Sequence, residues 1–306
     1  MSGLIRTSAR QTLITLPYRA TLLPRIIPPS SINNQESNVT NNSTDTEQYT
    51  RKKQFFNKVI TLFGRKPVLE VLQDPKLTVY RVHLSESNKP QGIISEIVEI
   101  AKKREIEVLY HSKQALSRIS KNAKQDQGVC VDILCPKHQS YDDFLAPVSL
   151  SLSQSPEQTI RLIALDRITN PQNLGMIIRS MCAGKIDGLL LPSKGCATID
   201  SLVVKASAGT LFKAPLLHCA SLTSALQESK KQGATIYGLS SHATQSISDK
   251  QTDRFVIYVL GNETEGMSQE ISALCDKSIS IPMNNGVESL NVAITASLLA
   301  FKEVLG

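Results

Sequence analysis

The sequence predicts an α/β protein with two folded parts, a small N-terminal module and a larger C-terminal domain built on a parallel sheet. From residue 160 onward, apolar segments of strand length are mostly followed by segments of helix length. These strands do not alternate cleanly between apolar and polar residues, which is typical of a parallel sheet with both faces covered. Residues 30–50 are polar with almost no apolar side chains, so they are expected to stay unfolded.

The N-terminal module is predicted over residues 61–135. Apolar residues at helical spacing predict a helix over 93–103, and a segment rich in β-formers predicts a strand over 77–84. The remaining elements are expected as helices over 67–72 and 113–119 and as strands over 107–110 and 128–134. Together they make a small α/β unit.

The C-terminal domain is predicted over residues 159–306. Its strands are expected over 160–165, 188–191, 235–239, 255–260 and 278–281. Its helices are expected over 174–183, 202–208, 222–231, 271–275 and 289–304. The strand over 255–260 is wholly apolar, which indicates burial on both faces of the sheet.

The first 60 residues are predicted to be a disordered basic tail with a linker. Residues 1–35 carry four arginines and no acidic residue, a pattern typical of an organellar transit peptide and equally of a basic disordered tail. Both interpretations stay open, so the protein is expected in the cytoplasm, or in the mitochondrial matrix if this segment is a transit peptide. Residues 136–158, rich in Ser, Pro and Gln, are predicted to be a second linker.

Composition excludes some classes of protein. No apolar run approaches the roughly 20 residues that a membrane span needs, which indicates a soluble protein. The six cysteines form no CxxC pair and no histidine has zinc-finger spacing, which argues against a structural metal and for a reducing compartment.

The net charge of +7 is unevenly distributed. Residues 1–60 contain 8 basic and 3 acidic residues, whereas residues 156–306 contain 13 of each. The surplus therefore lies on the N-terminal side. A basic excess suits a polyanionic partner such as RNA.

Three glycine-containing segments each follow a predicted strand of the C-terminal domain. They are 170–179 (NPQNLGMIIR), 260–266 (LGNETEG) and 281–291 (IPMNNGVESLN). Ligands of open α/β sheets bind beyond the carboxyl ends of the strands, so three such loops predict a shared ligand site. None has the GxGxxG or GxxxxGK[ST] pattern, which disfavours an ordinary dinucleotide site and a P-loop.

In this order, the segments resemble the three motifs of the SpoU (TrmH-type) branch of the SPOUT methyltransferases. The first matches N-x-G-x-x-x-R, the second G-x-E, and the third I-P-M followed by S-L-N-V. The resemblance covers residues 160–306 almost without gaps. In the N-terminal module, 63–70 (FGRKPVLE) and 126–129 (DQGV) resemble the two ends of the L30e-like substrate-binding domain common in this family.

This resemblance implies an RNA ribose 2′-O-methyltransferase. It would transfer a methyl group from S-adenosylmethionine to the 2′-hydroxyl of a guanosine in structured RNA, with rRNA favoured over tRNA because of the L30e-like module. The resemblance also implies a deep trefoil knot and a homodimer whose active site is completed by the partner subunit. The leaving group of a sulfonium is neutral, so neither a general acid nor a metal is needed.

The resemblance makes Arg179 catalytic, with Asn173, Glu263, Ser289 and Asn291 as further candidates. Because the pKa of arginine lies above about 12, we interpret Arg179 as binding a phosphate and polarising the hydroxyl rather than acting as a base. Glu263 is expected to orient Asn173, Arg179 or the partner's loop. Ser289 and Asn291 open the last predicted helix, where they either cap it or fix the donor or the ribose.

Two further groups of candidates bind donor and RNA. The donor-binding candidates are Gly261, Ile281, Leu290, Met283 and Leu239, with a plain core role as the alternative for Ile281 and Leu290. The RNA-binding candidates are Lys102, Lys103, Arg104, Gly175 and Lys205. The run 102–104 ends a predicted helix, where a solvated terminus favoured by the helix dipole is the alternative. Gly175 lies one turn before Arg179, where a missing side chain would let the RNA backbone approach.

Two rival functions remain open. One is a SPOUT enzyme that methylates a base, which the N-x-G-x-x-x-R motif disfavours. The other is a non-catalytic RNA-binding ribosome-assembly factor, for which loss of Arg179 or Asn291 would be expected, yet both are present. One departure is Glu288, beside Ser289, which puts a negative charge near the site and is expected to tune which RNA is accepted.

Overall fold

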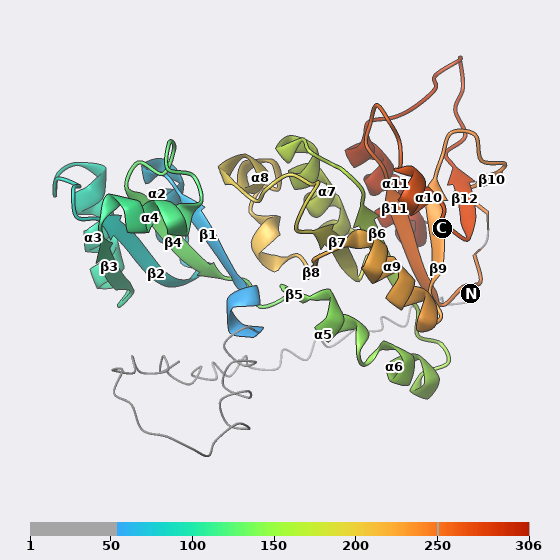
Figure 1. Ribbon diagram of the computed structural model, residues 1–306, viewed down its shortest axis with the longest axis horizontal. Coiled ribbons are helices and arrows are strands. Elements are labelled where there is room, and N and C mark those ends of the chain that lie inside the picture. The colour runs from blue at the N-terminus through green and yellow to red at the C-terminus, as the bar shows by residue number, and fades with distance from the viewer. Residues whose placement is uncertain (1–53, 250, 306) are drawn as a thin grey trace, which may run out of the picture. The chain divides into compact units, whose positions relative to one another are not determined.

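The computed structural model describes residues 54–249 and 251–305, and these form two sheets (Figure 1). Of the predicted tail and linker over residues 1–60, residues 1–53, with the candidate transit peptide, lie outside the described residues, whereas a helical turn over 54–57 and a strand from Val59 replace the predicted disorder in the rest. No helix among the described residues is long and apolar enough to cross a membrane.

The N-terminal module is built on a four-stranded mixed sheet in the order β1-β4-β2-β3. Strands β2 and β3 are parallel, and β4 runs antiparallel to both β1 and β2. The strands are β1 (Val59–Phe63), β2 (Thr78–Ser85), β3 (Glu107–His111) and β4 (Val129–Leu134). The helices are α2 (Arg65–Gln73), α3 (Ile93–Lys103) and α4 (Lys113–Ser120). The sequence did not predict β1, which spans the boundary predicted at residue 61 between the tail and the module.

Arg104 has a structural role in this module that differs from the predicted one. Its guanidinium donates to the carbonyl oxygens of Leu72 (2.7 Å), Asp74 (3.2 Å) and Leu77 (2.7 Å). The last carbonyls of a helix have no partner within the helix, so Arg104 satisfies the end of α2 and the turn that follows it. These contacts give Arg104 a role inside the module, and its role as an RNA ligand stays a prediction.

The C-terminal domain is built on an eight-stranded sheet in the order β10-β12-β9-β11-β6-β7-β8-β5. Every neighbouring pair is parallel, as the apolar strands predict. The strands are β5 (Gln139–Ser140), β6 (Ile160–Leu165), β7 (Gly188–Pro192), β8 (Leu216–Cys219), β9 (Thr235–Leu239), β10 (Gln245–Ser246), β11 (Phe255–Leu260) and β12 (Lys277–Ser280). The knot implied by the resemblance stays a prediction.

Both faces of this sheet are buried. In β6, Ile163 and Leu165 pack into one apolar cluster, and Leu162 and Ala164 into the other. The first cluster includes residues of α7 (Pro171–Ala183), α8 (Ser201–Ala206) and α11 (Val292–Leu305). The second includes residues of α9 (Leu222–Lys231) and α10 (Gln269–Ser272). A strand buried on both sides reads as continuously apolar, which explains the pattern in the sequence.

Residues 136–158, for which the sequence predicts a linker, contain regular structure. They form β5, α5 (Tyr141–Leu145) and α6 (Val148–Gln154), and β5 pairs with β8 at one edge of the large sheet. Tyr141 is fully buried, and its hydroxyl hydrogen-bonds to the Ser229 hydroxyl on α9. The serines and prolines in this segment are typical of a loop, but three buried apolar residues have helical spacing. They are Tyr141, Leu145 and Val148.

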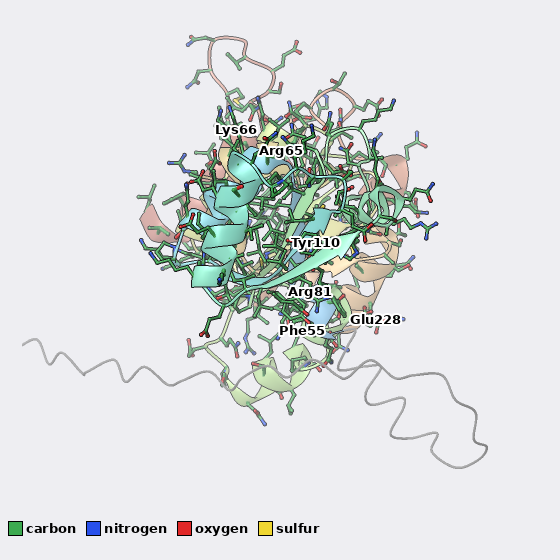
Figure 2. All side chains as sticks on the ribbon, turned by 90° about the vertical axis from the view of Figure 1, so that its left-hand side faces the viewer. Phe55, Arg65, Lys66, Arg81, Tyr110 and Glu228 are labelled. Atoms are coloured by element: carbon green, nitrogen blue, oxygen red, sulfur yellow. The ribbon has the colours of Figure 1, made fainter. Side chains whose placement is uncertain are left out.

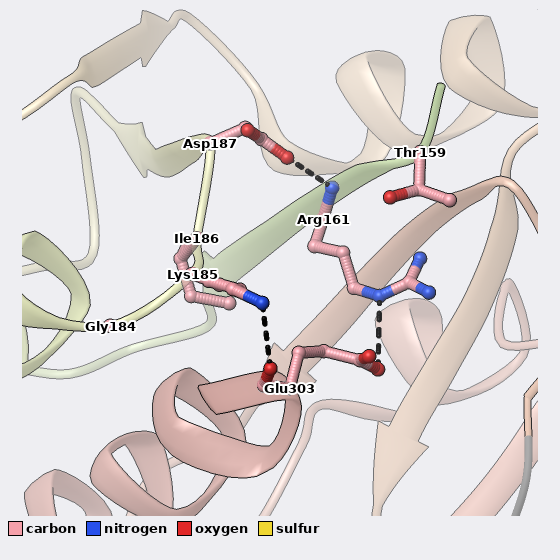
Figure 3. Close-up of a pocket in the computed structure, with 7 residues that line it drawn as sticks. All are labelled: Thr159, Arg161, Gly184, Lys185, Ile186, Asp187 and Glu303. Atoms are coloured by element: carbon pink, nitrogen blue, oxygen red, sulfur yellow. Dashed lines mark hydrogen bonds and ion pairs between the residues drawn. The ribbon is translucent and has the colours of Figure 1, made fainter. Parts of the chain in front are cut away.

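The amino ends of the strands carry charges that pair with one another. Around a cavity of about 340 Å³, the Arg161 guanidinium lies 3.5 Å from the Glu303 carboxylate (Figure 3). Lys185 donates to the Glu303 carbonyl at the end of α11 (2.8 Å), and the Arg161 backbone N–H donates to Asp187 (2.8 Å). Burial raises the pKa of Asp187. These contacts join β6, the turn before β7 and the last helix.

A second polar cluster lies along the same amino edge. The Asp253 carboxylate accepts hydrogen bonds from Thr235 (2.8 Å), Tyr237 (2.5 Å) and Lys277 (3.0 Å). Burial alone would raise the pKa of Asp253, but these hydrogen bonds outweigh it and lower the pKa to about 2. The cluster joins β9 and β12 to the segment that enters β11.

Candidate active site

The carboxyl edge of the large sheet has a topological switch point between β6 and β11. After β6 the chain adds β7 and β8 on one side, and it later adds β9, β11 and β12 on the other. Ligands of open α/β sheets bind where the strand order reverses in this way. The first motif forms the start of helix α7, which follows β6, and the second motif forms the loop that leaves β11 (Figure 1).

Asn173 joins all three motifs. The Asn170 side chain caps α7, accepting from the backbone N–H groups of Gln172 (2.8 Å) and Asn173 (3.4 Å), which fixes the first turn of the helix. Asn173 is buried, donates to the Glu263 carboxylate through Nδ2, and accepts from Asn291 Nδ2 at 3.0 Å. A carboxylate only accepts hydrogen bonds, so the pairing with Glu263 dictates which way the Asn173 amide points.

Of the two residues that could cap the last helix, Asn291 does so and Ser289 does not. The Asn291 Oδ1 atom accepts from the Ala293 backbone N–H (2.8 Å), and α11 begins at Val292. Ser289 lies before the helix and is exposed, so its predicted capping role belongs to Asn291. One amide therefore holds both the start of α11 and Asn173.

Arg179 and Gly175 have different surroundings although both lie on α7. Arg179 is exposed. Gly175 is buried, and a Cβ atom there would lie 2.5 Å from the Ala206 Cβ and 2.7 Å from the Val203 carbonyl oxygen. The prediction that Gly175 meets the RNA backbone is corrected, because its missing side chain lets α7 pack against α8. Lys205 is exposed on α8.

A cavity of about 610 Å³ lies beside this network. All five donor-binding candidates line it, namely Leu239, Gly261, Ile281, Met283 and Leu290, as do Glu263 and Ser289. Sequence reasoning missed several polar residues that also line it: Ser240, Ser241, His242, Ser278, Ser280 and Thr295. Most of them stand at or just beyond strand ends, which was the available signal, but no motif marks them.

The second motif forms a closed turn at the mouth of this cavity. The backbone N–H of Asn262 donates to the Gly266 carbonyl (3.0 Å), and the Gly266 N–H donates back (2.9 Å). A Cβ atom on Gly261 would lie 2.3 Å from the Gly266 carbonyl carbon, so no side chain fits there. The turn presents the Gly261 backbone to the cavity and the Glu263 carboxylate to Asn173.

Two family models match the chain over the two sheets. The model of the "SpoU rRNA Methylase family" matches residues 161–301. The model "RNA 2'-O ribose methyltransferase substrate binding" matches residues 61–136. Both matches agree with the predicted family and with the order of its two domains.

Individual relatives give the same result. The chain is 30% identical over 240 residues to an "uncharacterized tRNA/rRNA methyltransferase" of Mycolicibacterium vanbaalenii, covering 78% of this chain and 74% of the relative. It is 31% identical over 241 residues to one of Mycobacterium leprae, covering 78% and 75%.

Solved structures share the fold. The SpoU methyltransferase AviRb from Streptomyces viridochromogenes, in complex with AdoMet, superposes with a TM-score of 0.52 at 20% identity, over 87% of this chain and 95% of AviRb. An AdoMet-bound rRNA methyltransferase from Sinorhizobium meliloti gives 0.50 at 22% identity, over 84% and 90%. With three motifs meeting at one cavity, two matching family models and these relatives, the chain belongs to the SpoU family of S-adenosylmethionine-dependent RNA ribose 2′-O-methyltransferases.

Proposed function

We propose that this protein methylates the ribose 2′-hydroxyl of a guanosine in structured RNA, with rRNA as the favoured substrate over tRNA. One observation carries the proposal: buried Asn173 hydrogen-bonds to both Glu263 and Asn291, so the three motifs meet beside a cavity, with Arg179 exposed on the same helix. The match to a substrate-binding family supports RNA as the substrate, and the family matched by the C-terminal domain is described as an rRNA methylase family, which supports rRNA.

The cavity suits S-adenosylmethionine in size and charge. Its volume of about 610 Å³ lies within the usual range for a small-molecule site, roughly 300–1,000 Å³. Leu239, Ile281 and Leu290 give it apolar walls. Its lining has three carboxylates, Glu263, Glu265 and Glu288, and no lysine or arginine, which suits a cationic sulfonium. When bound, the donor supplies an electrophilic methyl group and a neutral leaving group.

The residues around the cavity can position the ribose and assist loss of its proton. The exposed Arg179 guanidinium offers planar, charged donors, so it binds the phosphate next to the target ribose and polarises the hydroxyl. Asn173 and Glu263 hold the start of α7 against the second loop, which fixes the helix that carries Arg179. The proton leaves to that phosphate or to water.

The single test of this proposal is ribose-methylation mapping of total RNA from a strain lacking the protein. A 2′-O-methylated nucleotide resists alkaline cleavage, so we expect one rRNA guanosine to become cleavable in that strain and to be protected again on complementation. A modified base that leaves the ribose free would favour the SPOUT base methyltransferase. An unchanged map would favour the RNA-binding assembly factor.

A second proposal concerns where RNA docks on the N-terminal module. The loops at one end of its sheet carry the exposed side chains Arg65, Lys66, Lys89, Lys121 and Lys124. Arg65 and Lys66 appear together at the top of the module in Figure 2, away from Arg81. They occupy the first turn of α2, where the helix dipole disfavours cations, so helix stability does not explain them.

Hydrogen bonds tie these loops into one surface. The Arg65 backbone N–H donates to the Gln127 side chain (3.1 Å), and the Arg65 guanidinium donates to Asn88 Oδ1 (3.3 Å). The nearby acid Asp126 is buried and accepts from the Gly128 N–H and the Ser120 hydroxyl, both at 2.9 Å. The exposed charge of this surface is therefore mostly positive, as docking to phosphates requires.

Matched double variants decide between this surface and the basic run predicted from sequence. Lys66→Ala with Lys124→Ala should lower RNA affinity and reduce the slope of log affinity against log salt by about 1.5, since each phosphate contact contributes roughly 0.7–0.9. Lys102→Ala with Lys103→Ala also removes two exposed charges but lies where the dipole favours cations, and should leave the slope unchanged. A reduced slope in the Lys102/Lys103 variant, with an unchanged slope in the Lys66/Lys124 variant, would instead support the RNA-binding role predicted for Lys102 and Lys103 from the sequence.

We also propose that the protein is a homodimer through α11. This helix exposes the apolar side chains Ile294, Leu298 and Leu305, spaced four and seven residues apart. Such an apolar stripe marks an interaction surface, and a second copy would bring its own loops to the site. Leu298→Glu should convert a dimer to a monomer in sedimentation analysis, and a monomeric wild type would contradict the proposal.

A further inference from the structure

We infer that Arg167 is a positioning residue for methyl transfer, which holds the donor-binding turn against the loop that starts the catalytic helix. Arg167 follows β6, and the turn 261–267 follows β11. No motif contains Arg167, yet it stands three residues before the first motif and contacts the second. The inference rests on the proposed donor site and adds a residue that orients it.

Arg167 makes contact with the turn through both its side chain and its backbone. Its guanidinium pairs with the Glu265 carboxylate and donates to the Gly266 carbonyl at 3.0 Å. Its own carbonyl accepts from Asn262 Nδ2 at 3.1 Å. Asn262 and Gly266 are the two residues whose mutual backbone hydrogen bonds close the turn, so Arg167 binds both ends of that closure.

The neighbouring residue strengthens the connection. Asp166 is buried, and its carboxylate accepts from the Ser268 backbone N–H (2.6 Å) just beyond the turn. Its second oxygen lies 3.6 Å from the Arg167 Nε atom, an ion-pair distance that is too long for a hydrogen bond. Two neighbouring residues, Asp166 and Arg167, therefore connect the loop after β6 to the loop after β11.

The backbone of Arg167 is held in an uncommon conformation. Its φ is 60°, in the left-handed region that non-glycine residues seldom adopt. Such a conformation persists when surrounding contacts determine it, as those to Asn262 and Gly266 do here. A glycine would adopt this φ without strain, which separates the backbone contribution from that of the side chain.

The relative strength of these contacts sets the expected effects. Glu265 is 67% exposed, so its ion pair with Arg167 is screened and contributes little. The bond from the guanidinium to the Gly266 carbonyl is charge-assisted and holds the turn that places Gly261 at the cavity. Loss of the guanidinium should therefore matter more than loss of the Glu265 charge.

The test is calorimetric titration of the full-length protein with S-adenosylmethionine in the absence of RNA. Arg167→Ala and Arg167→Gly should each raise the donor Kd about tenfold, the loss expected for one charge-assisted hydrogen bond. Arg167→Lys, which keeps the charge but not the geometry, should raise it about threefold. Glu265→Gln should raise it less than Arg167→Ala does, because the ion pair between Glu265 and Arg167 is exposed and screened. Lys231→Ala, which breaks an exposed ion pair on α9, is the control and should change nothing.

Kinetics and RNA binding separate positioning from other roles. The KM for the donor should rise with its Kd and kcat should fall several-fold, since the same turn carries Glu263, while RNA affinity stays unchanged. Donor affinity at the wild-type level in Arg167→Ala would overturn the inference, as would a loss confined to RNA affinity, which would make Arg167 an RNA contact. If Arg167→Ala does not fold, Arg167→Lys is the variant to measure. An unchanged donor Kd in Arg167→Lys would also overturn the inference. Absence of donor binding in the wild type would instead overturn the proposed function itself.

Discussion

The two edges of the large parallel sheet use polar side chains in different ways. At the amino edge, charged groups pair with one another, as Arg161 does with Glu303 and Asp253 with Lys277. At the carboxyl edge, Asn173 and its partners form a network beside an open cavity, with Arg179 exposed nearby. Charged groups that are paired with one another stabilise the fold. Polar groups that border a cavity, with an exposed cation nearby, can instead act on a bound ligand.

The largest effect is expected at the carboxyl edge. Arg179→Ala should lower the rate of methyl transfer by about 100- to 1,000-fold, the loss typical of removing one transition-state donor. Donor affinity should stay nearly unchanged, because Arg179 does not line the cavity. Single-turnover transfer of labelled methyl groups measures the first, and calorimetry the second. A large loss of donor affinity would contradict the assigned division of roles.

An intermediate effect is expected for Asn173→Ala. The change removes the hydrogen bonds to Glu263 and Asn291, and a loss of about 2 kcal/mol would slow transfer about 30-fold. Asn173→Asp should be at least as slow, because a carboxylate would face the Glu263 carboxylate. The melting temperature of both variants should stay within a few degrees of the wild type. Transfer at the wild-type rate in either variant would remove Asn173 from the active site.

The smallest effect on activity is expected at the amino edge. Asp253→Asn should lower the free energy of unfolding by about 1–2 kcal/mol at pH 7 and leave donor affinity unchanged, because it weakens the cluster with Tyr237 and Lys277. The pKa of Asp253 is lowered to about 2 in the folded protein, so its stabilisation is present above about pH 4 and is lost as the pH falls toward 2. Wild type and variant should therefore converge in acid denaturation. A change in the donor affinity of Asp253→Asn would contradict the view that the amino edge stabilises the fold without contributing to the donor site.

Much of the C-terminal fold follows from apolar patterning. Strands β6, β9 and β11 and helix α9 have the bounds that the sequence predicts, because buried strands and an amphipathic helix leave uninterrupted signals. Strand β8 was missed because its four residues include a histidine and a cysteine. The strand β5 that pairs with it has two residues, which is below what any periodicity resolves.

The site was predictable through its motifs but not through its contacts. The motif residues Glu263 and Asn291 indeed lie beside Asn173, although no spacing in the sequence shows that one buried amide holds both. The packing of Gly175 against α8 and the backbone contacts of Arg104 were not predicted, for a shared reason. A missing side chain or a charge in the sequence looks the same whether it faces RNA or the protein's own backbone.

The short strand β5 has a consequence for exchanging catalytic domains between relatives. Although it lies in the segment expected to be a linker, β5 completes one edge of the catalytic sheet, and the following helix places Tyr141 against α9. A chimaera joined at residue 159 would lack that edge strand and leave an apolar groove open to solvent. A junction near residue 136 keeps β5 and α5 with the catalytic sheet, so the segment to be exchanged begins more than thirty residues before the first motif.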